Sequence, residues 1–153
     1  LHPLILDDLG LVPAIEWLAQ TFSQRHGVAC ELHIDESLEL QEPYATAVFR
    51  IVQESLVNVA KHAQARTARV RVAREGGEIV LEVRDDGAGF DEGGQRSELQ
   101  VGLKIMRERA DQIGATVTVD SAVGQGTTVT LRVPTTQPPK TKPTPAAELS
   151  SEP

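Results

Sequence analysis

Residues 43–62 read PYATAVFRIVQESLVNVAKH, and this stretch decides the fold. Its large apolar residues recur at the spacing of one helix face; they are Val48, Ile51, Val52, Leu56 and Val59. We therefore predict a helix that has Pro43 near its start and runs to about His62.

Beside its apolar stripe, the same helix carries four polar residues: Glu54, Asn58, Lys61 and His62. At about 100° per residue they share a neighbouring stripe of the helix, about 100° wide. A neutral amide oxygen suits a hard cation such as Mg²⁺, and a lysine one turn later can meet a phosphate. A solvated helix flank with i,i+4 pairs explains the same residues, so the helix alone leaves both interpretations open.

Patterns on either side of this helix predict the remaining elements. Helical spacing marks residues 11–26 and 101–113, and alternating residues mark strands at 28–34, 67–74, 78–84, 115–120 and 127–133. Gly76-Gly77 predicts a hairpin turn. The order of elements favours a two-layer α/β sandwich, with a mixed, mostly antiparallel sheet of about five strands and about three helices on one face.

Three glycine-containing segments are candidate ligand sites. Asp85-Asp86-Gly87-Ala88-Gly89 follows a strand; its Asp can accept a hydrogen bond from an exocyclic amine, and its glycines allow close approach of a ligand. Gly102 just before a helix favours an anion site. Gly124-Gln125-Gly126-Thr127 opens a strand and carries a hydroxyl suited to phosphate. Taken singly, each segment is also explained by an ordinary turn or by core packing.

Composition narrows the class of protein. The chain has 153 residues, of which 40% are hydrophobic, and that is enough for one domain. No apolar run approaches the roughly 20 residues of a membrane span, so we expect a soluble piece. A net charge of −7 and 3% aromatic residues argue against a nucleic-acid binder. The single cysteine, Cys30, excludes an internal disulfide.

The ends of the chain differ from its middle. Because residue 1 is Leu rather than Met, we expect a piece of a longer protein, with residues 1–10 as the end of an element that starts upstream. Residues 11–134 are the predicted folded domain. Residues 135–153 are rich in proline and poor in large apolar residues, which predicts a disordered tail.

The order of the motifs resembles the ATP-binding domain of the GHKL superfamily, which has the Bergerat fold, in the version found in bacterial sensor histidine kinases. The motifs are E-x-x-x-N-x-x-K-H, D-x-G-x-G, V-G-L-x-I-M-R-E-R-A and G-x-G-T-x-V. The likeness extends from Leu1 to about Pro134. The segment LHPLILDDLGL looks like the junction after the second dimerisation helix. The sequence of the V-G-L-x-I-M-R-E-R-A motif is most similar to that of the subgroup that includes the nitrate/nitrite sensor kinases.

The resemblance implies a role for each residue of the helix stripe. Asn58 is similar to the Asn that chelates Mg²⁺. Glu54 matches a Glu that polarises the attacking water in related ATPases and helps to position the acceptor in kinases. Lys61 looks like the phosphate-contacting Lys, and His62 is implied to lie beside the adenine or its sugar.

The glycine segments are given roles by the same resemblance. Asp85 resembles the Asp that reads adenine, with Gly87 and Gly89 making room. Residues 90–100 look like the ATP lid, and Gly102 with Leu103 looks like its phosphate-side hinge. Gly124, Gly126 and Thr127 match the last of the family's motifs, G-x-G-T-x-V. Many relatives read G-x-G-L where this chain has Gln100-Val101-Gly102-Leu103, so its lid hinge departs from the common pattern.

The implied activity is transfer of the γ-phosphate of ATP, with Mg²⁺, to a His on a dimerisation helix that this piece lacks, for relay to an Asp of a response regulator receiver domain. His2 does not fit the acceptor motif. We expect the cytoplasmic portion of a membrane-anchored sensor, without nucleic-acid or membrane contact of its own. We also expect the piece to be a monomer and the intact protein a homodimer.

Three other functions remain as alternatives. The first is a nucleotide-operated ATPase clamp, in which Glu54 would act as the base for hydrolysis. The second is a serine kinase of the anti-sigma type. The third is a degenerate domain that only makes dimer or partner contacts.

Overall fold

A computed structural model describes residues 3–89 and 97–134 of the chain. Its elements follow in the order α1 (Leu4–Leu9), α2 (Leu11–His26), β1 (Ala29–Ile34), α3 (Tyr44–Asn58), the π-helical turn η1 (Val59–Ala63), β2 (Thr67–Glu75), β3 (Glu78–Asp85), α4 (Ser97–Gln112), β4 (Thr116–Ser121) and β5 (Thr127–Pro134). Among the helices in these ranges, none has the length and apolar character needed to cross a membrane.

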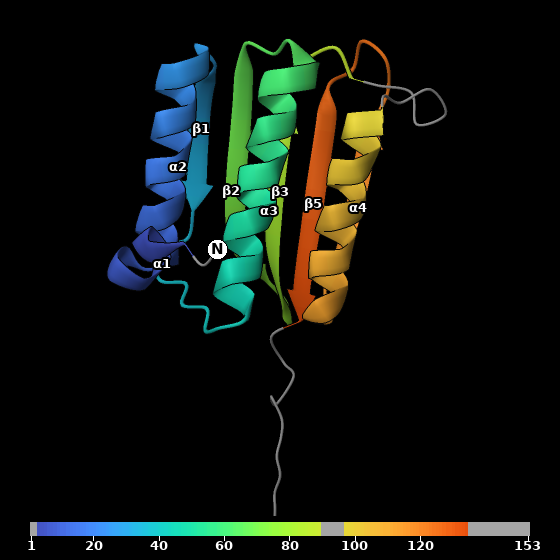
Figure 1. The fold of residues 1–153 in the computed structure, drawn as a ribbon. Helices are drawn as coiled ribbons and strands as arrows, with labels where there is room; N and C mark the ends of the chain where they lie inside the picture. The colour runs from blue at the N-terminus through green and yellow to red at the C-terminus, as the bar shows by residue number, and fades with distance from the viewer. Residues whose placement is uncertain (1–2, 90–96, 135–153) are drawn as a thin grey trace, which may run out of the picture.

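The strands form one mixed sheet in the order β1-β2-β3-β5-β4. Strands β1 and β2 run parallel, whereas the other three pairs are antiparallel. Helices α2, α3 and α4 lie side by side on one face of the sheet, as Figure 1 shows. The predicted two-layer sandwich is therefore confirmed.

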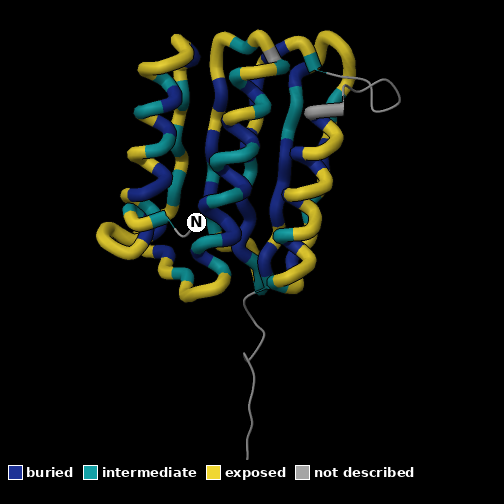
Figure 2. The backbone as a smooth tube through the Cα atoms, in the orientation of Figure 1, coloured by how far each residue is buried: buried dark blue, intermediate teal, exposed yellow. Residues whose placement is uncertain are grey.

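The core lies between the helices and the sheet, where Figure 2 shows the buried residues. On β2, apolar and charged residues alternate between the two faces of the sheet. Val70 and Val72 are therefore fully buried, whereas Arg69 is exposed on the other face. That other face carries ion pairs between neighbouring strands, such as Arg132 with Glu78 at 3.3 Å. The sheet thus has one face that packs and one face that meets water.

Two helix boundaries differ from the prediction. Helix α4 begins at Ser97 rather than at residue 101, because Leu99 is buried and extends the apolar stripe of the helix by one turn. Helix α3 ends at Asn58, and the chain continues through η1 before Gln64 leaves it with a φ of 54°. The predicted tail at 135–153 and residues 90–96 of the predicted lid lie outside the described residues.

Candidate active site

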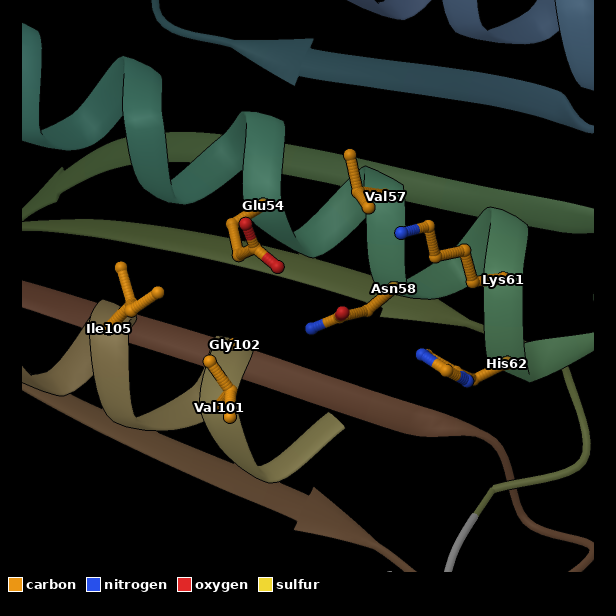
Figure 3. Close-up of a pocket in the computed structure, with 8 residues that line it drawn as sticks. All are labelled: Glu54, Val57, Asn58, Lys61, His62, Val101, Gly102 and Ile105. Carbon is orange, nitrogen blue, oxygen red and sulfur yellow. The ribbon is translucent and has the colours of Figure 1, made fainter. Parts of the chain in front are cut away.

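A cavity of about 320 Å³ lies between α3 with η1 on one side and α4 on the other. It is lined by Glu54, Val57, Asn58, Lys61, His62, Val101, Gly102 and Ile105. Figure 3 shows the Asn58 amide and the His62 ring extending toward the side of α4, with the Glu54 carboxylate across from Gly102. The four polar residues of the predicted helix stripe therefore meet at one cavity. We call residues 54–62 of α3 and η1 the helical wall.

The helical wall holds polar groups that other side chains do not occupy. No hydrogen bond or ion pair joins Glu54, Asn58 or Lys61 to another side chain within the described part of the chain. Asn58 and Glu54 are half-buried, so their polar ends are partly shielded from water. Polar groups that are half-buried and unoccupied are suited to a polar ligand.

The turn that carries Lys61 and His62 has unusual backbone geometry. Both residues lie in η1, a five-residue π-helical turn that follows α3 directly. Turns of this type are rare and occur frequently at functional sites. Gln64 then takes the left-handed conformation, which residues other than glycine adopt uncommonly. The sequence prediction of one regular helix to His62 did not include this change of geometry.

Gly102 allows α4 to come close to the helical wall. A Cβ atom at this position would lie 2.7 Å from Glu54 Oε2 and 3.5 Å from Asn58 Oδ1. The residue is buried inside α4, five positions after its first residue, so its predicted place at a helix N-terminus is wrong. Its role in the structure is to leave space for a carboxylate rather than to offer a free N–H group.

Apolar residues form the rim of the cavity. Val57, Val101 and Ile105 are 37%, 57% and 38% exposed, although each has a large apolar side chain. None of these three residues was predicted from the sequence to line a site, because their proximity depends on how α3 and α4 pack. Leu103, by contrast, was a predicted binding residue, and its side chain is 6% exposed in the core and does not line the cavity.

A second group of predicted residues meets where β3 ends and β5 begins. Asp85 is in register with Thr127, and its carboxylate accepts hydrogen bonds from the backbone N–H of Gly87 (2.8 Å) and from that of Thr127. It is only 7% exposed, and this burial raises the pKa of Asp85 above its ordinary value. A buried carboxylate at a strand end is suited to accept a hydrogen bond from a ligand.

Close backbone contacts hold the segment around Asp85. The Gly124 N–H donates to Ala88 O at 2.6 Å. A side chain on Gly89 would overlap the backbone of Ala122, and one on Gly126 would overlap the carbonyl of Asp85. We call residues 85–89 together with 121–127 the strand-end junction. Gly89 and Gly126 are required because two backbone segments approach there without room for a Cβ atom.

Two residues of the strand-end junction were not singled out from the sequence. The Ser121 hydroxyl lies 2.8 Å from Thr127 Oγ1 and 3.1 Å from Gly126 O, and so links β4 to β5. Asp86 accepts hydrogen bonds from the start of β2. Their partners are on other strands, so the sequence alone offers no signal for either contact.

A second cavity, of about 380 Å³, lies between the first turn of α3 and the last turn of α4. Its carboxylate, Glu42, already accepts hydrogen bonds from the backbone N–H and the hydroxyl of Thr46, at 3.1 and 2.8 Å. None of the predicted site residues lines it. Size alone therefore does not mark the functional cavity.

Comparisons with solved structures agree with the fold. The chain matches the Erythrobacter litoralis EL346 blue-light activated histidine kinase with a TM-score of 0.72 and 21% identity, over 84% of this chain and 43% of that one. It matches the mycobacterial sensor histidine kinase MprB with a TM-score of 0.61 and 20% identity, over 80% of this chain and 92% of that one. At these identities the likeness concerns the fold alone.

Sequence comparisons find relatives of higher identity. The chain is 37% identical to the oxygen sensor histidine kinase NreB of Staphylococcus carnosus, over 89% of this chain and 40% of the relative. It is 33% identical to the histidine-protein kinase/phosphatase DegS of Bacillus subtilis, over 87% of this chain and 36% of the relative. The chain thus spans about two-fifths of the length of these relatives. The family model described as histidine kinase-, DNA gyrase B-, and HSP90-like ATPase matches residues 44–137. The chain therefore belongs to this ATPase family, as the order of its motifs predicted.

Proposed function

We propose that the chain is the ATP-binding catalytic domain of a sensor histidine kinase, and that it presents the γ-phosphate of ATP to a His on helices outside it. The observation that carries the proposal is the helical wall, where Glu54, Asn58 and Lys61 face one cavity without partners among the described residues. Membership of an ATPase family supports ATP as the ligand. The two relatives described above are both named histidine kinases.

The residues present fit a nucleotide with its metal. An amide and a carboxylate, Asn58 and Glu54, are the unoccupied oxygen donors of the cavity, and Lys61 supplies a cation for phosphate. The described residues hold no cluster of three His, Cys, Asp or Glu for a metal, so Mg²⁺ would depend on Asn58 and on phosphate oxygens. When bound, Mg²⁺ neutralises charge on the phosphates.

In this proposal the protein contributes position and charge rather than covalent chemistry, as phosphoryl transfer requires. Lys61 holds phosphate oxygens, His62 packs beside the nucleoside, and Asp85 accepts a hydrogen bond from the adenine amine. Glu54 positions the acceptor imidazole. Gly87 and Gly89 leave room for the base, and Gly126 with Thr127 braces the strand-end junction. The phosphoryl group would then pass to the Asp of a response regulator.

The first test is calorimetric titration of the chain with ATP, with and without Mg²⁺. We expect saturable heat with Mg²⁺ and at least a tenfold loss of affinity in Asn58→Asp, about 1.4 kcal/mol, because a carboxylate there repels phosphate. The matched control is Gln112→Glu, which makes the same amide-to-acid change in the second cavity and should bind like the wild type. Circular dichroism checks that both variants fold. Absence of heat at millimolar ATP in the wild type would contradict the proposal.

The second test separates the kinase from its alternatives. The chain is mixed with dimerisation helices that carry a phosphoacceptor His and with ATP labelled on the γ-phosphate. Acid-labile label on the helices indicates transfer to His. Acid-stable label indicates a serine kinase, and release of free phosphate alone indicates an ATPase clamp.

A further inference from the structure

Asp86 connects the end of β3 to the start of β2. Its Oδ1 accepts the backbone N–H groups of Arg66 (2.9 Å) and Thr67 (3.0 Å), and its Oδ2 accepts the Thr67 hydroxyl at 2.8 Å. In the opposite direction, the Asp86 N–H donates to Thr67 O at 3.3 Å. Four hydrogen bonds therefore join one residue to the two-residue segment at which β2 begins.

The segment held by Asp86 follows the C-terminal end of the helical wall after a short connection. The π-helical turn η1 carries Lys61 and His62 and ends at Ala63, and only Gln64 and Ala65 separate it from Arg66. The left-handed conformation of Gln64 reverses the chain within that short distance. A shift of Arg66 and Thr67 would therefore also move the residues of η1 that line the cavity.

Asp85 is held in a different way, although it is the neighbour of Asp86. Its carboxylate accepts N–H groups from Gly87 and Thr127, and the Gly124 N–H holds Ala88. All of these contacts lie inside the strand-end junction. The position of Asp85 therefore does not depend on the Asp86 side chain.

We propose that Asp86 is a positioning residue that fixes the distance between the phosphate-side residues of the helical wall and the base-side residue Asp85. The inference rests on the proposed function, because it treats the two regions as the two halves of one nucleotide site. Both Asp86 and Thr67 are exposed, so water competes for their hydrogen bonds. Loss of the Asp86 side chain should therefore change position more than it changes overall stability.

The test compares two ligands that use different parts of the site. Adenosine uses Asp85 and, on the wall, only His62, whereas ATP with Mg²⁺ also uses Asn58 and Lys61 and so needs both sides at the correct separation. In Asp86→Ala, calorimetry should show ATP affinity reduced about tenfold and adenosine affinity reduced much less, by about twofold at most. Asp86→Asn should bind ATP like the wild type, because its Oδ1 accepts both N–H groups and its amide meets the Thr67 hydroxyl. Asp120→Ala removes an exposed Asp from the same end of the sheet and should change neither affinity.

Three results would overturn the inference. Equal losses for both ligands in Asp86→Ala would indicate a general structural role, unchanged ATP binding would exclude the positioning role, and failure of Asp86→Asn to restore ATP binding would exclude the hydrogen bonds as its cause. If the wild type bound neither ligand, the proposed function would fail instead. Amide exchange at Arg66 and Thr67 would then decide whether Asp86 holds the segment: faster exchange confined there in Asp86→Ala supports it, and unchanged exchange contradicts it.

Discussion

The helical wall and the strand-end junction use their polar side chains in opposite ways. In the wall, three polar side chains lack partners in the described part of the chain, and they face a cavity. In the junction, the carboxylates of Asp85 and Asp86 accept backbone N–H groups, and glycines allow two backbones to cross. The wall thus leaves its polar groups available to a ligand, whereas the junction uses most of its polar groups to hold its own backbone, with Asp85 as the residue proposed to do both.

This difference predicts how each region responds to substitution. Substitution of Glu54, Asn58 or Lys61 in the wall should alter ligand affinity and leave folding intact, because these side chains have no hydrogen bond or ion pair to another side chain in the described part of the protein. Changes in the buried part of the junction should alter folding first, because its groups are already bound to one another; Asp86 is exposed and is the exception.

The largest effect is expected at Gly126, in the junction. Its φ is +76°, and a Cβ atom would overlap the carbonyl of Asp85, so Gly126→Ala combines backbone strain with a clash against backbone. We expect the free energy of unfolding to fall by about 3 kcal/mol and the melting temperature by about 10 °C. Thermal and urea unfolding of the purified chain measure both quantities.

Gly124 provides the matched control. It also has a positive φ, +80°, but a Cβ atom there meets nothing within 4 Å. Gly124→Ala should therefore cost only the strain, about 1 kcal/mol. Equal losses in the two variants would show that the backbone crossing is not as tight as the structure indicates, and the distinction between the regions would weaken.

A smaller effect is expected at Gly102, which faces the wall. In Gly102→Ala the new methyl group displaces the Glu54 carboxylate, whereas alanine is otherwise the better residue inside a helix. We expect unchanged or slightly higher stability and a loss of ATP affinity of about fivefold, as measured by calorimetry.

A double-mutant cycle identifies the cause of this loss. If displacement of Glu54 explains it, Gly102→Ala should have little further effect in a Glu54→Ala background. The same fivefold loss in both backgrounds would instead implicate the backbone of α4.

Much of this fold could be predicted because local patterns and tertiary packing agree. On β2, Val70 and Val72 alternate with Arg69 and Arg71, and the strand was predicted to within one residue at its end. The start of α4 was missed although the signal was present. Leu99 lies one turn before Leu103 on the buried stripe, but Gly102 was interpreted as the boundary of the helix. A glycine in a helix can instead serve contact with a neighbour, here Glu54.

The candidate site was predictable as a set of residues but not as a geometry. Helical spacing indicated that Glu54, Asn58, Lys61 and His62 share a side, and the cavity brings them together. The sequence VAKHA contains no signature of a π-helical turn. The partner of Asp86 lies 19 residues away on another strand, so the contact depends on strand register, which local patterns do not encode.

The smallest effect concerns Asp85, where the junction meets the predicted ligand. Burial raises the pKa of Asp85, so the folded state binds its proton more tightly than the unfolded state does. Its ionisation therefore costs stability: folding is favoured below the unfolded pKa, and the advantage is lost as the pH rises through the raised folded pKa. Asp85→Asn is neutral and can still accept the Gly87 N–H, so at pH 7 it should be slightly more stable than the wild type.

The gain in stability should shrink as the pH falls, because the wild-type carboxyl then becomes neutral as well. Asp86 stays in both proteins: hydrogen bonds to Thr67 lower its pKa, and its negative charge adds to burial in raising the pKa of Asp85. Urea unfolding from pH 4 to 8 measures this trend, and calorimetry should show weaker ATP binding by the same variant, because an amide is a poorer acceptor for the adenine amine. A variant that lost stability at every pH would show that the negative charge of Asp85 supports the junction, and the two regions would then differ less than their contacts indicate.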